Sequence, residues 1–259
     1  MFYGGINVRV EVHVLRYGDD WIVPYVVRHY LSYADKLVIH DAGGGAPIGH
    51  LADKDHRIVV VPWDDCPQVD ELKYTELRNT CWKGTDADWC VVADLDELIY
   101  FPEGADKTLG AYTRMGAAVI RPHGFELFSE TYPTGEGQIY DEIKMAAPDD
   151  KWYAKPILFS PKLVSETRLG LGSHESDPVL HDARRFHVGP LWPFANPPTY
   201  LLHCHHIGPK EVIAAKFDAT HARMCEMNRK MHWGNLEPGI KHVEDKRAGI
   251  VPNLRQLIP

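Results

Sequence analysis

Residues 89–98 read Trp-Cys-Val-Val-Ala-Asp-Leu-Asp-Glu-Leu, an apolar run that leads directly into three acidic residues. The apolar half predicts a buried strand, whereas carboxylates are rarely buried unless they are paired or hold a metal. Ligands of helix-flanked parallel sheets bind at the carboxyl ends of the strands. We therefore expect Asp94, Asp96 and Glu97 to lie where this strand ends, facing a cleft.

The spacing of Asp94 and Asp96 predicts a metal site. Residues two apart in an extended segment point to the same side, so both carboxylates can reach one place. Two like charges this close repel each other unless a cation lies between them, and Mg²⁺ or Mn²⁺ suits oxygen ligands. An isolated Asp-x-Asp pair also fits a solvated turn or a helix cap, but the buried-type strand before it favours the metal site.

The composition indicates one large α/β domain. The chain has 259 residues, of which 44% are hydrophobic and 25% charged, as in ordinary globular proteins. A net charge of -8 gives no broad basic face, so we expect no nucleic-acid partner. Five cysteines without paired metal spacing or a secretory leader predict reduced thiols and a cytoplasmic location. No apolar run approaches the ~20 residues of a transmembrane helix; the oligomeric state stays open.

The hydrophobic pattern alternates between strands and helices, which predicts a mainly parallel sheet flanked by helices. Valines alternate with polar residues over 8–14, the pattern of a strand with one buried face. The other predicted elements are strands at 36–40, 57–61 and 117–122 and helices at 21–31, 69–83 and 209–229.

Two polar side chains stand beside these elements where a nucleotide could bind. Asp41 closes the strand at 36–40 and precedes the glycine-rich turn 42–47, an order typical of nucleotide-binding junctions. A flexible turn with a helix cap explains it equally well. Arg78 in the helix at 69–83 could reach a diphosphate, although a solvated helix charge is the usual outcome for a lone arginine.

Later segments add candidate ligands and a candidate lid. Residues 199–209 again run from an apolar strand into ligand-type residues, with His203 and His205 on one side of the strand. A neutral imidazole is an ordinary Mn²⁺ ligand, although core or loop histidines are the alternative. Residues 123–150 predict a long irregular binding loop for an acceptor. Residues 231–259 predict an extension that wraps the domain or contacts another chain.

Several runs together resemble the glycosyltransferase family 2-like proteins of GT-A fold. The resemblance spans roughly residues 8–230 and rests on Asp41 after its strand and on the runs 77–84, 87–98, 137–143, 155–156 and 201–203. It implies a single GT-A (Rossmann-like) α/β domain over residues 6–230 with a C-terminal extension at 231–259. It also implies transfer of a sugar, with inversion, from a UDP- or GDP-type nucleotide-diphospho-sugar to a hydroxyl of a carbohydrate or glycan acceptor.

The resemblance assigns roles to individual residues. Asp41 would hold the nucleoside, Asp96 would bind the Mn²⁺ or Mg²⁺ ion directly, and Asp94 would be shared between the metal and the ribose. His203 matches the place where GT-A enzymes often supply a histidine to the same metal.

The catalytic base that would deprotonate the acceptor hydroxyl stays open. Asp141, Glu175 and Glu126 are the candidates, and Asp141 comes first because its segment belongs to the resemblance. A surface acid is the alternative for each of them.

Two other classes of function compete with the glycosyltransferase. A Mg²⁺-dependent phosphatase or phosphotransferase would use the first Asp of the pair as a nucleophile, but it expects the pair after the first strand rather than after about four. A non-catalytic nucleotide-sugar-binding module is the other alternative.

Overall fold

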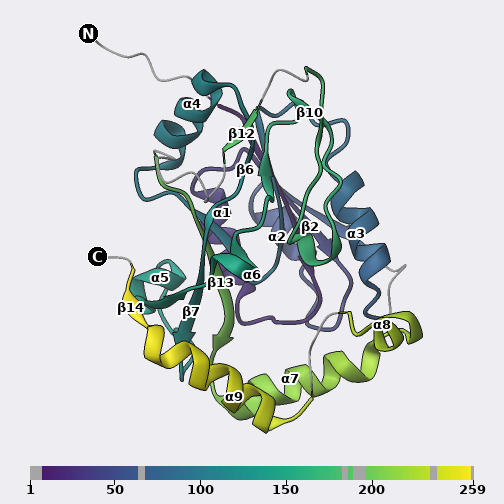
Figure 1. The fold of residues 1–259 in the computed structure, drawn as a ribbon, viewed down its shortest axis with the longest axis vertical. Helices are drawn as coiled ribbons and strands as arrows, with labels where there is room; N and C mark the ends of the chain where they lie inside the picture. Colours follow the sequence, from purple (N-terminus) through teal and green to yellow (C-terminus); the bar gives the residue numbers. More distant parts are fainter. Residues whose placement is uncertain (1–7, 64–67, 183–185, 189–196, 234–237, 258–259) are drawn as a thin grey trace.

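The computed structural model describes residues 8–63, 68–182, 186–188, 197–233 and 238–257, which form an α/β fold with mixed sheets (Figure 1). The larger sheet has the strand order β12-β6-β9-β4-β1-β2-β3 within these residues. Its strands are β1 (Val10–Arg16), β2 (Lys36–Asp41), β3 (Ile58–Pro62), β4 (Trp89–Asp94), β6 (Ala117–Ile120), β9 (Leu158–Phe159) and β12 (Phe186–Val188).

The parallel part of this sheet brings predicted site residues to one edge. Strands β3, β2, β1 and β4 are parallel neighbours, whereas β9 runs antiparallel to β4 and β6. Arg16 at the end of β1 is level with Asp41 of β2, and Leu15 is level with Asp94 of β4. Asp41 and Asp94 therefore flank the carboxyl end of β1.

The prediction of a half-buried first strand is wrong, because β1 is buried along its whole length. The valines face the main core, while Leu15 on the other face packs with Trp82, Val92 and Phe159. A strand in the middle of a helix-covered sheet has no solvent-facing side. The polar residues Glu11 and His13 are consequently buried as well.

A second sheet, in the order β14-β8-β7-β13-β5, begins where the first one ends. Its strands are β5 (Glu97–Tyr100), β7 (His123–Ser129), β8 (Met145–Pro148), β13 (Tyr200–Ile207) and β14 (Arg255–Gln256). Only β7 and β13 are parallel neighbours. The chain passes from β4 directly into β5, so Leu95 and Asp96 form the turn that joins the two sheets.

The prediction of a long irregular loop over residues 123–150 is wrong. The segment contains β7, β8 and the short helix α5 (Ile139–Glu142), and only its middle lacks helix or strand. Phe125 and Leu127 alternate with Glu126 in β7, but Glu126 is buried too, so burial does not follow the alternation of apolar and polar residues there.

The remaining helices flank the sheets. They are α1 (Val23–Leu31), α2 (His50–Lys54), α3 (Glu71–Thr80), α4 (Ala105–Met115), α6 (Asp150–Tyr153), α7 (Lys210–Arg223), α8 (Glu226–Met231) and α9 (Ile240–Ile250), with 3-10 turns at Leu171–Ser173 and Val251–Asn253 and a small hairpin of β10 (Val164–Glu166) and β11 (Val179–Leu180). Among the described residues, no helix combines the length and apolar character needed to cross a membrane.

The C-terminal segment packs onto the domain. Figure 1 shows α9 beside α7, and the two helices share a small core of Ile213, Phe217 and Val243. After α9 the chain adds β14 to the edge of the second sheet, where Arg255 pairs with Ala146. The segment thereby covers the side of the molecule where the second sheet carries its histidines.

Candidate metal centre

Three side chains at the junction of the two sheets form a group of possible metal ligands. One ligand atom each from Asp96, His203 and His205 lie within 4.8 Å of one another. Oδ2 of Asp96 is 3.3 Å from His205 Nδ1 and 3.9 Å from His203 Nε2. The structure thus brings together the predicted ligands Asp96 and His203 and adds His205, which the strand period places on the same side as His203.

A β-bulge in β13 shapes this group. His203 is level with Glu126 of β7, whereas His206 is level with Phe128, so β13 advances three residues while β7 advances two. The extra residue lets the backbone N–H groups of both His205 and His206 donate to Oε1 of Glu126, each at 3.1 Å. Bulges often redirect side chains beside functional sites.

Glu126 also sets the orientation of His203. Its Oε2 accepts a hydrogen bond from His203 Nδ1 at 2.6 Å, and Glu126 is only 2% exposed. Nε2, on the other side of the ring, faces Asp96, and although burial lowers the pKa of His203, Glu126 and Asp96 raise it overall. The ring is further held by Tyr153, which stacks on it at 4.1 Å between centroids. A carboxylate behind a histidine in this way is typical of metal ligands.

The charges around Asp96 favour its ionised form. Burial alone would raise the pKa of the Asp96 carboxyl, but His203, His205 and the Lys216 ammonium hold that pKa well below its usual range. Lys216 Nζ lies 3.9 Å from Asp96 and 2.5 Å from Asp19. Burial, and secondarily Lys216, lowers the pKa of His205, so its ring is neutral and able to bind a metal.

Asp94 and Glu97 do not join this group. Asp94 accepts two hydrogen bonds from Arg78 Nη2, at 2.8 and 3.1 Å, and Arg78 is 4% exposed. Glu97 lies 2.5 Å from Lys155 Nζ and accepts the backbone N–H of Asp94 at 3.0 Å. Two buried cations therefore balance the two acids that stand on either side of the Asp96 turn.

Asp41 lies at the same edge of the larger sheet and is held by Arg16. Oδ1 of Asp41 accepts from Arg16 Nη1 at 2.6 Å and from the Gly43 N–H at 3.0 Å. The Arg16 side chain is fully buried and also contacts Asp20 at 2.5 Å. The predicted nucleoside residue is therefore fixed in place by a neighbouring strand.

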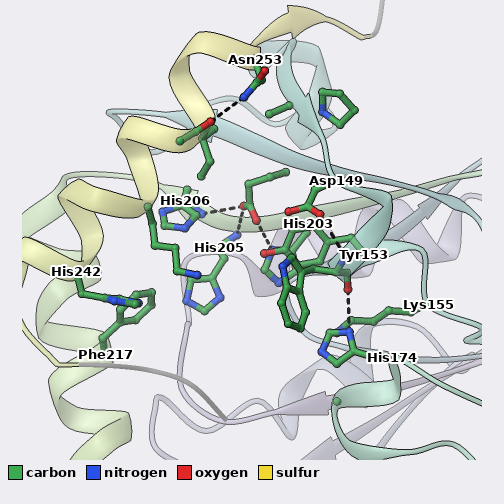
Figure 2. A pocket seen from close by; sticks show the side chains of 18 of the residues that line it. Asp149, Tyr153, Lys155, His174, His203, His205, His206, Phe217, His242 and Asn253 are labelled. Atoms are coloured by element: carbon green, nitrogen blue, oxygen red, sulfur yellow. Dashed lines mark hydrogen bonds and ion pairs between the residues drawn. The ribbon is translucent and has the colours of Figure 1, made fainter. Parts of the chain in front are cut away.

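A cavity of about 700 Å³ opens beside His203 and His205. Figure 2 shows Asp149, Tyr153 and His203 together on one side of it, with Phe217 and His242 on the opposite side. The first group comes from the second sheet and α6, and the second group from α7 and α9. Its lining combines carboxylates, imidazoles and aromatic rings: Glu71, Glu126, Asp149, Trp152, Tyr153, Lys155, His174, His203, His205, His206, Phe217, His232, Trp233, His242 and Lys246 among others.

The three predicted base candidates lie in different surroundings. Asp141 is exposed, and its Oδ2 accepts the Gln138 N–H at 2.6 Å as part of a capping box that opens α5. Glu175 is exposed as well, and neither residue lines the cavity. Glu126 does line it, but its oxygens are occupied by His203 and the β13 backbone.

Asp149 is a cavity carboxylate that the sequence does not single out. It caps α6, with its Oδ1 accepting the Trp152 N–H at 3.2 Å. Burial, followed by the nearby Glu126, raises the pKa of the Asp149 carboxyl. The only sequence signal is an acid placed just before a short helix, which many caps share.

The chain matches no model of a known protein family, and it matches no curated protein. The functional argument therefore rests on the geometry of the site.

Proposed function

We propose that the protein is a metal-dependent glycosyltransferase of GT-A type, which moves a sugar from a nucleotide-diphosphate donor to an acceptor hydroxyl. The observation that carries the proposal is the Asp96, His203 and His205 group, backed by buried Glu126 and open to a cavity of about 700 Å³. The group stands after β4, beside strand ends that carry Asp41 and Asp94.

The residues at this place fit a divalent cation. Asp96 supplies an ionised oxygen, and His203 Nε2 and His205 Nδ1 face that oxygen at 3.9 and 3.3 Å. One carboxylate with two imidazoles favours Mn²⁺ over Mg²⁺, which takes oxygen ligands almost exclusively. A bound cation would neutralise the charge that develops on the diphosphate as it leaves.

Asp149 is the base that this proposal requires. It shares the cavity with His203, and its raised pKa brings it closer to the pH at which a base works best. The acceptor hydroxyl gives its proton to Asp149 and attacks the anomeric carbon on the face opposite the leaving diphosphate, with inversion.

Aromatic side chains in the cavity suit a sugar acceptor. Trp152 is 45% exposed and lines the cavity beside Tyr153, while Phe217 and His242 face them from the other wall. Flat apolar faces combined with a few polar groups are typical of small-molecule sites. On the donor side, Asp41 would accept from the nucleoside, while Arg78 holds Asp94 on the other side of β1.

A thermal-shift screen of nucleotide sugars with and without Mn²⁺ tests the proposal, because a ligand that binds only the folded state raises Tm. We expect one UDP- or GDP-sugar to raise Tm only when Mn²⁺ is present, and Asp96→Ala to abolish the shift. Asp177→Ala, at an exposed carboxylate, should leave the shift unchanged. The absence of a Mn²⁺-dependent shift with every nucleotide sugar would overturn the proposal.

Activity assays on the same proteins separate the alternatives. Asp96-dependent hydrolysis of phosphate monoesters without nucleotide-sugar turnover would favour a phosphatase. Mn²⁺-dependent nucleotide-sugar binding without hydrolysis or transfer would favour a binding module. The proposed enzyme hydrolyses its donor slowly and transfers the sugar faster when the acceptor is present.

A further inference from the structure

A second group of metal-ligand side chains lies away from the cavity, on the face of the larger sheet that α3 covers. It combines His13 of β1, His40 of β2 and Cys81, the residue that ends α3. One ligand atom from each lies within 4.8 Å of the others. His13 and His40 are 2% and 7% exposed, and none of the three lines the cavity.

The two imidazoles already have nearly the separation that a tetrahedral ion requires. The strand register sets them diagonally on one face, since His13 is level with Val38 and His40 with Leu15. His13 Nδ1 is 3.1 Å from His40 Nε2, and the rings are stacked with an interplanar angle of 17°. With Zn–N bonds of ≈ 2.0–2.1 Å, two nitrogen ligands of a tetrahedral zinc are about 3.3 Å apart.

A buried carboxylate lies beside the outer ring nitrogen of His13. Oε1 of Glu11 lies 3.0 Å from His13 Nε2, and Glu11 is 8% exposed. Its carboxylate also accepts from Thr85 Oγ1 at 2.8 Å and from Lys36 Nζ at 3.2 Å. Nδ1, on the opposite side of the ring, faces His40, and a proton on Nε2 beside the Glu11 carboxylate would leave the Nδ1 lone pair free for a metal. Histidine ligands of metals commonly give their second N–H to a carboxylate in this way.

We propose that His13, His40 and Cys81 bind a zinc ion that fastens the end of α3 to β1 and β2. A thiolate with two imidazoles suits Zn²⁺ and disfavours Mg²⁺ or Mn²⁺, so this site takes a different metal from the cavity. The ion would also fix Arg78, one turn before Cys81 in α3, which holds Asp94 at the strand edge. Zinc here is independent of the proposed glycosyltransferase reaction.

Metal binding at Cys81 should be accompanied by loss of the thiol proton. Zinc binds cysteine as the thiolate, whereas an unbound thiol is protonated at neutral pH. A divalent ion binds the thiolate, and the S–H proton passes to the solvent as the metal–sulfur bond forms. Zinc uptake at neutral pH should therefore release one proton per site.

Cobalt(II) titration of the full chain, stripped of metal by a chelator, tests the site. We expect a thiolate-to-Co²⁺ charge-transfer band that saturates at one equivalent and that Zn²⁺ removes. Cys81→Ser should abolish the band, and Cys225→Ser, at a buried cysteine outside the cluster, should keep it. No band in the wild type, or a band that persists in Cys81→Ser, would overturn the proposal.

A second variant keeps the test decisive if Cys81→Ser fails to fold. His40→Gln retains the thiol, so the band should remain. Losing the hydrogen-bond partner of a metal ligand weakens binding by about 10- to 100-fold, and losing the ligand itself should weaken Zn²⁺ binding by more than that. Unchanged Zn²⁺ affinity in His40→Gln would exclude this ligand set. Asp96→Ala should leave the band intact, which distinguishes this site from the cavity.

Discussion

The molecule carries two groups of similar composition in opposite surroundings: the cavity cluster of Asp96, His203 and His205, and the sheet cluster of His13, His40 and Cys81. In each, a buried glutamate lies within 3.0 Å of one ring nitrogen of a histidine, Glu126 in the cavity cluster and Glu11 in the sheet cluster. They differ in the third donor, which is a carboxylate in one and a thiol in the other.

Exposure separates the two clusters further. His203 and His205 of the cavity cluster line a space of about 700 Å³, whereas the sheet cluster lies between strands and the end of α3. An ion with free coordination positions beside a cavity can act on a ligand, and an ion enclosed by protein can only hold elements together. Support of a histidine by a carboxylate is therefore common to both clusters. The third donor and the access from the cavity distinguish their roles.

Removing the Asp96 carboxylate should have the largest effect on the cavity cluster. Asp96→Ala takes away the one anionic ligand of the cavity cluster, and we expect donor turnover to fall by at least about 10³-fold, because the metal stabilises the charge of the leaving group. Mn²⁺ affinity, measured by electron paramagnetic resonance, should fall in parallel. Cys81→Ser should show the reverse pattern, losing cobalt–thiolate absorption while keeping Mn²⁺. Turnover within tenfold of wild type in Asp96→Ala would contradict the assignment.

Asp149→Asn should separate the chemical step from metal binding. We expect kcat for sugar transfer to fall by about 10²- to 10³-fold, the usual contribution of a general base, while Mn²⁺ affinity and donor KM stay within about twofold. The wild-type rate should rise with pH through the raised pKa of Asp149, and the variant should lack that limb. Glu175→Gln is the matched control at an exposed acid. Equal losses of kcat and Mn²⁺ affinity would mean that Asp149 supports the metal instead.

His29 shows what burial alone does to a histidine and is the reference for both clusters. It is 2% exposed, its Nε2 is 2.9 Å from the Ile99 carbonyl oxygen, and burial lowers its pKa from 6.5 to about 4. Between these values the unfolded chain binds a proton that the folded chain does not. The contribution of His29 to the free energy of unfolding is therefore fully present above pH 6.5 and is lost as the pH drops toward about 4.

The full shift of His29 corresponds to roughly 3 kcal/mol in the free energy of unfolding. Urea unfolding of chelator-treated protein at pH 7 and pH 4.5 should show a smaller pH-dependent loss in His29→Gln than in wild type. His56→Gln, at a ring that is 95% exposed, should keep the wild-type loss. An identical pH dependence in His29→Gln would mean that other groups control acid stability.

Exchanging each supporting glutamate for glutamine should weaken metal binding at one cluster and leave the other unchanged. Glu126→Gln keeps the shape but weakens the hold on His203 Nδ1, so we expect Mn²⁺ to bind about 10- to 100-fold more weakly. Glu11→Gln should weaken Zn²⁺ binding to a similar extent and leave Mn²⁺ unchanged. Each variant is the control for the other, and isothermal titration with both ions measures the effects. If one variant weakened both metals, the two clusters would not be independent.

Local patterns predict strands β1 to β4 and the positions of Asp96 and His203. The period of two in residues 8–14 indicates β1, the apolar runs that follow indicate β2, β3 and β4, and the step from apolar to acidic residues places Asp96 at a strand end. The same reasoning places His203 late in the chain on another strand. These features depend on near neighbours in the sequence, and sequence patterns record such neighbours directly.

Tertiary contacts explain what could not be predicted. The bulge in β13 depends on the register with β7, and the pairing of Arg78 with Asp94 joins a helix to a strand. Glu126 resembled a loop acid because its histidine partner lies 77 positions away in the chain. The burial of Glu11 and His13 follows from helix cover over β1, which the alternating pattern does not reveal.

Substitution of Asp141 should have only a small effect on stability and sugar transfer. In the sequence it was the first candidate for the base, but its carboxylate accepts the Gln138 N–H at 2.6 Å, and it lies outside the cavity lining. Asp141→Ala removes one cap hydrogen bond from the exposed helix α5, so we expect a loss of about 1 kcal/mol in the free energy of unfolding. Transfer kcat should stay within about twofold, because the proposed base is Asp149. A loss of kcat in Asp141→Ala larger than that in Asp149→Asn would return the base to α5 and require the acceptor to approach from that side.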